Sequence, residues 1–204
     1  MIHKNVKTDF SPEVHDPVID ATAYLHPLAA LIGNTIIGKR VMFSLFTAVR
    51  GDVSQPLFIG DNSNVQGGVV IHALEIFSHG KPVEKNMEEV GGIKYAVHIG
   101  NRVSLAHQVQ IHGPPSVGDD TFVGMKTLVS RARVGKKCVV EPGCIVMGVT
   151  VPGGRYIPAG TTLNEKAKAD TFPAITDAYP LKDLNAGVVY VNMNLAVEYK
   201  KAGL

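Results

Sequence analysis

Large apolar residues, mostly branched aliphatics, recur in this chain at every sixth position. Stepping by six from Ile99 meets only aliphatic residues as far as Val129, and the step resumes after a slip of one residue. The series are Ile37, Phe43 and Val49; Ile59, Val65 and Ile71; Ile99, Leu105, Ile111, Val117, Val123 and Val129; Val134, Val140 and Val146; and, in parallel, Val139, Ile145, Val151 and Ile157. A period of six fits neither an α-helix nor an ordinary alternating strand. It is typical of a hexapeptide β-helix, in which each short strand turns one apolar side chain inward.

Three such strands make one triangular coil of about 18 residues, and successive coils stack about 4.8 Å apart. The alternative is a β-sandwich of many short strands. Sandwich strands alternate with a period of two and have loops of irregular length, so the regular step favours the β-helix. We therefore expect a mainly β fold, a parallel β-helix of hexapeptide repeats.

The whole chain, residues 1–204, reads as one domain with four parts. We expect an N-terminal arm at 1–17, the β-helix at 18–160 with an inserted loop at 76–94, a linker at 161–180 and a C-terminal helix at 181–201. The insertion is rich in charge and lacks the six-residue register. The helix is predicted from apolar residues spaced by three or four, which are Leu184, Val188, Val191, Leu195 and Tyr199. A helix folded back over the stack would help to cover its exposed strand edges.

Charge and composition exclude several classes of protein. Lys and Arg total 20 against 18 Asp and Glu, so we expect no nucleic-acid partner. A hydrophobic content of 45% and a charged content of 19% exclude disorder and suggest a surface partly covered by other subunits. The N-terminus has no apolar signal segment and no apolar run reaches membrane length, so we expect a cytoplasmic protein with no membrane partner. Cys138 and Cys144 do not form a metal or redox motif, and we expect both to be reduced.

Three of the eight histidines lie inside the repeat. His72 and His112 each directly follow an inward isoleucine, and they are 40 residues apart. Removing an insertion of about 22 residues leaves one coil, so both should lie on the outer surface of consecutive coils, about 5 Å apart. That spacing suits two imidazoles on one metal ion. His107 has a different phase and should meet them only across a subunit interface, which a three-fold assembly would repeat three times.

Several strings of the sequence resemble those of the γ-class carbonic anhydrases, in the same order and over nearly the whole chain. They are Arg50-Gly-Asp52, GDNSNVQGGVVIHALE (60–75), VSLAHQVQIHGP (103–114), GDDTFVGM (118–125), RYIPAG (155–160) and VVYVN (188–192). The resemblance implies a left-handed β-helix, a homotrimer and three interfacial metal sites. His72, His107 and His112 take the metal-ligand places, with Zn²⁺ as the expected metal and Fe²⁺ or Co²⁺ as alternatives.

The implied activity is the reversible hydration of CO₂ to bicarbonate. Three imidazoles leave one metal position open for water, whose pKa falls to about 7; carbonic anhydrase is itself the standard example of this chemistry. By the same resemblance, Gln66 and Asn64 orient the water and the substrate. Glu75 takes the place of the proton shuttle, and Tyr190 and Asn192 match residues of the terminal helix that come near the site.

The resemblance also places Arg50 and Asp52 in an ion pair between subunits. Two departures bear on activity: Val53 stands where well-studied active members carry Glu, and Gly67 replaces Asp in the family's Gln-Asp-Gly. Three other functions therefore remain open. They are a metal-dependent acyl-CoA thioesterase, a hexapeptide acyltransferase with a His base and no metal, and a weakly active or non-catalytic assembly subunit.

Overall fold

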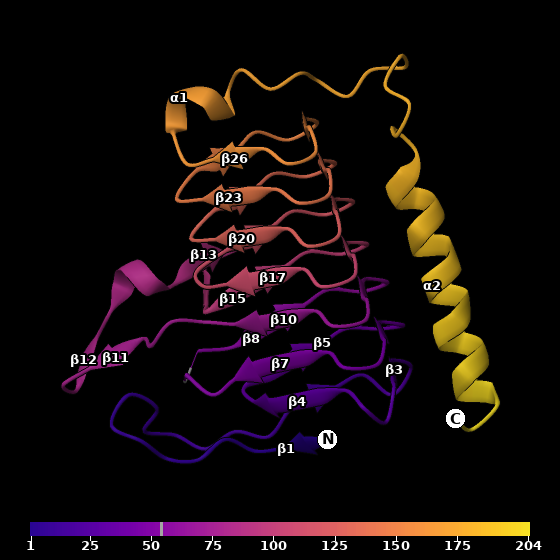
Figure 1. Ribbon diagram of the computed structural model, residues 1–204. Helices are drawn as coiled ribbons and strands as arrows, with labels where there is room; N and C mark the ends of the chain where they lie inside the picture. Colours follow the sequence, from indigo (N-terminus) through magenta and orange to yellow (C-terminus); the bar gives the residue numbers. More distant parts are fainter. Residues whose placement is uncertain (54) are drawn as a thin grey trace.

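The six-residue period folds into a triangular prism of stacked coils (Figure 1). The computed structural model describes residues 1–53 and 55–204. Parallel strands form three sheets of eight, seven and seven strands, which we call sheets A, B and C. The chain passes through sheets B, C and A in turn. The expected left-handed β-helix with a C-terminal helix is confirmed.

The strands of the prism are short, from two to four residues each. Sheet A contains β1 (Ile2–His3), β4 (Ala30–Gly33), β7 (Ala48–Gly51), β10 (Val70–His72), β17 (Gln110–His112), β20 (Leu128–Ser130), β23 (Ile145–Met147) and β26 (Thr162–Leu163). Sheet B contains β2 (Val18–Ile19), β5 (Thr35–Ile37), β8 (Leu57–Ile59), β15 (Val97–Ile99), β18 (Ser116–Val117), β21 (Arg133–Val134) and β24 (Thr150–Val151). Sheet C contains β3 (Tyr24–Leu25), β6 (Met42–Phe43), β9 (Asn64–Val65), β16 (Ser104–Leu105), β19 (Phe122–Val123), β22 (Val139–Val140) and β25 (Tyr156–Ile157).

The core consists of the inward aliphatic side chains stacked coil on coil. Ile71 pairs with Ile111 on one side and is at most 1% exposed, as is its partner. A second slip of register follows Val146, so the inward series continues through Val151. The expectation that Ile145 belongs to the inward series is wrong. Its side chain is 38% exposed because it neighbours an inward valine on the same strand, where side chains alternate.

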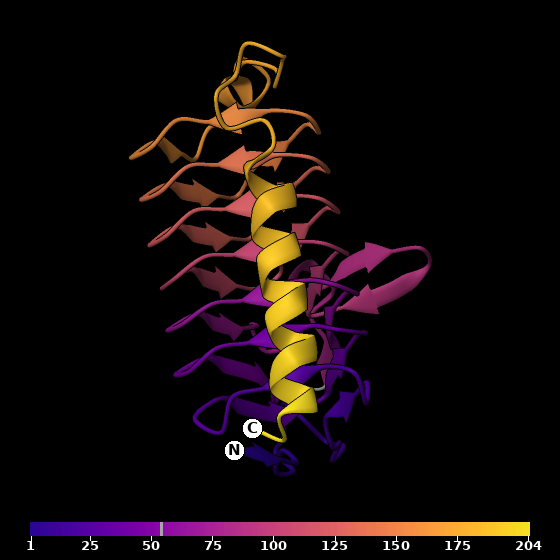
Figure 2. The same ribbon diagram turned by 90° about the vertical axis from the view of Figure 1, so that its right-hand side faces the viewer.

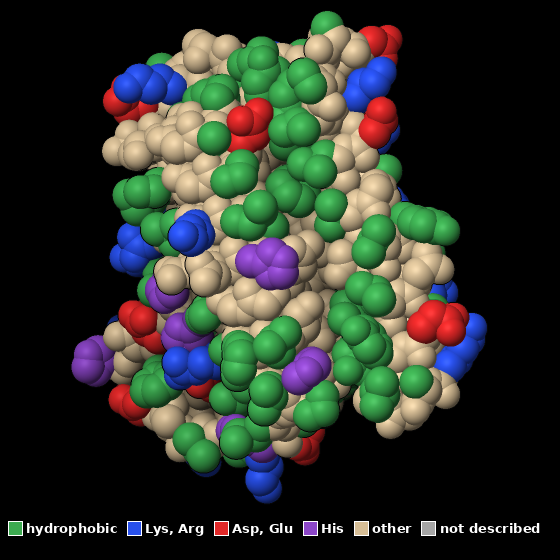
Figure 3. Space-filling view, turned by 45° about the vertical axis from the view of Figure 1, so that its right-hand side comes forward, with side chains coloured by type: hydrophobic (Ala, Val, Ile, Leu, Met, Phe, Trp, Pro, Cys, Tyr) green, Lys and Arg blue, Asp and Glu red, His purple; other side chains and the backbone are tan. Residues whose placement is uncertain are grey.

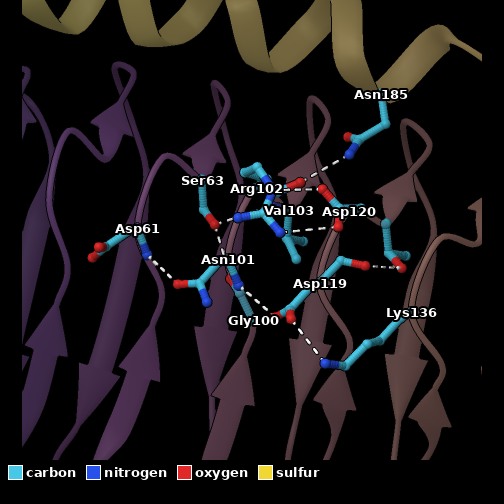
Figure 4. A network of polar contacts seen from close by, with 11 residues as sticks. Asp61, Ser63, Gly100, Asn101, Arg102, Val103, Asp119, Asp120, Lys136 and Asn185 are labelled. Carbon is cyan, nitrogen blue, oxygen red and sulfur yellow. Dashed lines mark hydrogen bonds and ion pairs between the residues drawn. The ribbon is translucent and has the colours of Figure 1, made fainter.

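A ladder of polar side chains fixes the spacing of the coils at the corner between sheets B and C (Figure 4). Asp61 N–H donates to Asn101 Oδ1 at 2.8 Å, and Asn101 N–H donates to Asp119 Oδ1 at 3.0 Å. Lys136 Nζ then donates to Asp119 Oδ2 at 3.0 Å. A Cβ at Gly100 would lie 2.5 Å from Asp119 Oδ1, so this close approach requires glycine. The ladder adds side-chain hydrogen bonds to the backbone pairing that holds the coils in register.

The insertion between β10 and β15 is folded. A hairpin of β11 (Phe77–Ser78) and β12 (Lys81–Pro82) leads into the short 3₁₀ helix η1 (Glu84–Asn86). A second hairpin of β13 (Glu88–Val90) and β14 (Ile93–Tyr95) returns the chain to sheet B. In Figure 1 the first hairpin projects from the stack at the end of β10.

Helix α2 (Leu184–Lys201) lies lengthwise over sheet C (Figure 2), while the short α1 (Lys166–Ala169) lies beside the last coil. The buried side of α2 contains Asn185, Val189 and Ala196. The predicted apolar stripe is therefore wrong in part: Val191 and Leu195 are 53% and 39% exposed. The buried side instead carries Ala196, which is small, and the Asn185 amide, which hydrogen-bonds to a coil, so the helix packs more closely there. No helix among the described residues is long and apolar enough to cross a membrane.

The N-terminal arm adds β1 to the edge of sheet A and then folds into a loop held by Asn5. Asn5 Nδ2 donates to Ser11 Oγ at 3.0 Å and to the Glu13 carbonyl at 2.9 Å. Asn5 Oδ1 accepts the His15 N–H at 2.7 Å. The side chain is 3% exposed, so this staple is a buried part of the fold.

Candidate metal centre

His72 and His112 lie side by side at the ends of β10 and β17. The two strands are paired with His72 directly opposite His112. Their ring centroids are 5.6 Å apart, with the planes at 66° to each other. Each ring is half-buried and points away from the core because the residue before it points inward.

The histidine pair opens onto a cavity of about 420 Å³. Glu75, at the start of the insertion, lines the cavity and is exposed. Val53 also lines it and is only 4% exposed. The cavity therefore contains two imidazoles, the exposed carboxylate of Glu75, the ion pair of Arg50 and Asp52, and apolar side chains beside them.

Phe10 and Thr8 of the N-terminal arm line the same cavity. No pattern in the sequence predicts this, because the arm precedes the first readable repeat. Their placement depends on the Asn5 staple, which is a tertiary contact. The arm thus forms one wall of the candidate site.

Asp52 contacts both Arg50 and His72. Arg50 Nη2 lies 2.8 Å from Asp52 Oδ2, and His72 Nε2 lies 3.2 Å from Asp52 Oδ1. The hydrogen bond from His72, followed by those from Arg50 and against the effect of burial, lowers the pKa of Asp52 to about 2. Residues 50 and 52 share one face of an extended segment, so the ion pair forms within a single chain. The pair between subunits stays a prediction, in which Asp52 or Arg50 would change its partner.

The pKa of His112 is lowered, first by burial and then by the nearby His72 and Arg131. Both effects disfavour the charged imidazolium. The neutral ring is the form that binds metal ions. The environment of His112 therefore suits a metal ligand.

His107 lies at a different corner of the prism, in the turn after β16, and is exposed. It lines a groove of about 810 Å³ beneath α2, together with Gln66 and Asn192. Gln66 Nε2 donates to Asn64 Oδ1 at 3.0 Å, and Asn64 Nδ2 donates to Ser104 Oγ at 2.9 Å. Asn64 and Ser104 are fully buried. They hold the Gln66 amide at the edge of the groove.

Tyr190 lies on the opposite flank of α2 from Asn192. It is 67% exposed and lines a second groove of about 620 Å³ with Arg102 and Asp120. Within one chain, only Asn192 of the two predicted helix residues is close to His107.

One chain therefore carries two half-sites. One half-site lies at the carboxyl ends of the sheet A strands and contains His72, His112, Glu75 and Asp52. The other contains His107, in the turn that leads to the opposite ends of these strands. Among the described residues of a single chain, no group of three or more His, Cys, Asp or Glu side chains could hold a metal ion. Several large apolar side chains are exposed on sheet A and at the corner near His107; they are Leu45, Phe46, Val70, Met125, Ile145 and Met147. Figure 3 shows hydrophobic side chains among polar ones on this side of the molecule.

Comparison with known proteins identifies relatives of this chain over most of its length. No protein-family model matches it. It is 52% identical to "Carbonic anhydrase" of Methanosarcina thermophila over 201 residues, which cover 98% of this chain and 81% of that protein.

Two further relatives are more distant. The chain is 35% identical to "Carboxysome assembly protein CcmM" of a Nostoc species, over 94% of this chain and 33% of that protein. It is 31% identical to "Gamma carbonic anhydrase 2, mitochondrial" of Arabidopsis thaliana, over 68% of this chain and 45% of that protein. The coil stack, the half-sites and these similarities agree: the chain belongs to the γ-class carbonic anhydrase family.

Proposed function

We propose that this protein catalyses the reversible hydration of CO₂ to bicarbonate at metal sites between the subunits of a homotrimer. In each site His72 and His112 come from one chain and His107 comes from its neighbour. The observation that carries the proposal is the in-register pair of His72 and His112 at the carboxyl ends of the sheet A strands. The third histidine, His107, lies near the opposite ends of these strands. The 52% identical relative, which is named as a carbonic anhydrase, supports the activity.

A three-fold arrangement would bring the half-sites together. In a closed head-to-tail ring, one edge of each chain meets the opposite edge of the next, so three identical sites form. The exposed apolar side chains on this face support such contacts, because large patches of this kind mark interfaces. Val70 and Met147 on sheet A are 40% and 43% exposed, and Phe46 at the His107 corner is 65% exposed.

The donor set fits a divalent cation. The lowered pKa of His112 favours the neutral ring, and His72 lies at the distance expected of a second ligand. Zn²⁺ is the metal we propose, and Fe²⁺ and Co²⁺ also accept imidazole ligands. When bound, the cation supplies a Lewis acid that makes a water molecule reactive at neutral pH.

The side chains around the histidines have separate tasks. Gln66, held by Asn64, orients water and substrate by hydrogen bonding. The reaction joins a hydroxide to the carbon of CO₂ and leaves one proton to be removed. Glu75 is exposed and lines the cavity, so it can take this proton and pass it to a base in solution. Val53 cannot share this task, and Asp52 is already bonded to Arg50 and His72, so we assign proton removal to Glu75.

The test is stopped-flow CO₂ hydration by protein of assayed metal content, prepared both with and without oxygen. Hydration that scales with bound metal supports the proposal. A protein with full metal content and no hydration contradicts it.

A second candidate function is the hydrolysis of acyl-CoA thioesters by the same site. The groove beside His107 and Gln66 is about 810 Å³ and largely apolar, far larger than CO₂ requires. Release of free thiol from a panel of acyl-CoAs, absent in His107→Ala, would support this function. A non-catalytic role in an assembly is favoured by Val53, which stands in place of a carboxylate, and by the name of the CcmM relative.

A further inference from the structure

The start of the insertion determines where Glu75, the proton acceptor of the proposed function, is placed. Glu75 is the last residue before Ile76, which is fully buried. The side chain of Glu75 is exposed, while the direction in which it leaves the backbone depends on the segment that follows. Among the described residues, the Glu75 carboxylate has no hydrogen-bond or ion-pair partner. The position of this side chain therefore depends on its main chain.

Asn86 holds that main chain. Its Nδ2 donates to the Glu75 carbonyl oxygen at 2.7 Å, across eleven residues of sequence. Asn86 is only 4% exposed, so water does not readily replace this hydrogen bond. Two backbone bonds close the same loop: Val83 N–H donates to the Ile76 carbonyl at 2.7 Å, and Asn86 N–H donates to the Val83 carbonyl at 2.9 Å.

We infer that Asn86 is a positioning residue for the proton acceptor Glu75. The inference rests on the proposed function for the role of Glu75. Asn86 fixes the backbone that carries the Glu75 carboxylate at the cavity of the histidine pair. The side chain beyond that point stays free to turn from the cavity to solvent, as a proton carrier must.

Proton transfer is sensitive to such positioning because the acceptor must lie within hydrogen-bond reach of the donor, directly or through one water. In this step an O–H bond of water breaks, an O–H bond to a Glu75 carboxylate oxygen forms, and a base in solution later removes the proton. No electrons are exchanged. The step follows the departure of bicarbonate, so it limits kcat without entering kcat/KM for CO₂.

The insertion offers a matched control. Glu88, 6% exposed, anchors the second hairpin: Arg133 Nε lies 2.6 Å from Glu88 Oε1, and Ser116 Oγ donates to the same oxygen at 3.3 Å. This anchor is buried to a similar extent and lies two residues from Asn86. Its hydrogen bonds and ion pair go to Arg133 and Ser116, and none of those found among the described residues reaches Glu75. Glu88→Gln therefore loosens the insertion without touching the Asn86–Glu75 bond.

The experiment compares Asn86→Asp, which keeps the shape but removes the donor, with Glu88→Gln and with the unchanged protein. In dilute buffer we expect kcat for CO₂ hydration to fall about 10-fold in Asn86→Asp, with kcat/KM unchanged. A concentrated, non-coordinating buffer should restore kcat, because it accepts the proton in place of Glu75. Adding Asn86→Asp to Glu75→Ala should cause no further loss. Hydrogen exchange at residues 76–86 should also rise in Asn86→Asp, while exchange in the coils stays unchanged.

The outcomes distinguish failure of the Asn86 inference from failure of the proposed function. An unchanged kcat in Asn86→Asp, beside a reduced kcat in Glu75→Ala, overturns the inference and leaves the proposed function intact. An equal loss in Glu88→Gln also overturns it, because general loosening would then explain the effect. Absence of CO₂ hydration in the unchanged protein contradicts the proposed function. In that case hydrogen exchange still tests the positioning role of Asn86. This role is refuted if Asn86→Asp does not raise exchange at residues 76–86.

Discussion

Replacing Val53 by glutamate should accelerate CO₂ hydration. Val53 is 4% exposed and lines the cavity shared by His72, His112 and Glu75, so a carboxylate there would face the water that must lose a proton. Positioned acid–base groups typically contribute about 10²–10⁴-fold. Glu75 already supplies part of this, and the apolar surroundings would raise the pKa of the new carboxyl. We therefore expect a gain of about 10-fold in kcat, which grows as the pH rises through that raised pKa.

The assay is stopped-flow hydration in dilute buffer, with metal content and assembly measured on the same samples. Val53→Gln is the control, because it matches glutamate in shape but cannot carry a proton. An equal gain in Val53→Gln would show that polarity or space, rather than proton transfer, limits the native protein. No gain in Val53→Glu, with metal intact and Glu75→Ala also without effect, would refute our account of the proton route.

Three further predictions follow from the ion pairs and hydrogen bonds. Arg50 has a side chain 47% exposed, so its pair with Asp52 within one chain contributes less than about 1 kcal/mol to the free energy of unfolding. If Arg50 and Asp52 pair between subunits, as predicted, Arg50→Ala should sediment as a dissociated species at low concentration; a fully trimeric species would contradict this. Burial tends to raise the pKa of Asp119, but hydrogen bonds from the Asn101 N–H of the preceding coil and from Lys136 of the next coil outweigh it and lower the pKa. Asp119→Ala should therefore cost about 1–2 kcal/mol at pH 7, by urea unfolding, and the difference should narrow as the pH falls below 3.8; a gap independent of pH would contradict this. Tyr179 donates to Glu141 Oε1 at 2.8 Å, so Tyr179→Phe should lower stability by about 1 kcal/mol and leave metal content unchanged.

The coil stack could be predicted because its core repeats in the sequence. Each inward position, such as Ile71 or Ile111, needs a branched aliphatic side chain at a fixed interval, and that regularity is visible without a structure. The face of α2 could not be predicted in the same way. Ala196 and Asn185 are buried because they fit against the coils, whereas Val191 and Leu195 are exposed beside the groove.

The candidate site was predictable only where it follows the repeat. Counting residues placed His72 beside His112, since both occupy the same phase of consecutive coils. The roles of Gln66 and Glu75 came from family resemblance, because nothing in their spacing implies them. Phe10 and Asn86 gave no signal, since their contacts join segments whose relative positions arise only on folding.

The central claim is that each metal site takes ligands from two chains, and complementation tests it most directly. His72→Ala and His107→Ala proteins are each purified, their metal content is measured, and they are then unfolded together and refolded as an equal mixture. Each variant alone should bind little metal. In random mixed trimers about a quarter of the interfaces receive His112 and an intact His72 from one chain and an intact His107 from the next, so metal and CO₂ hydration should return to about that fraction. Full metal content in either variant alone, or no recovery in mixtures shown to contain hybrid trimers, would contradict the account.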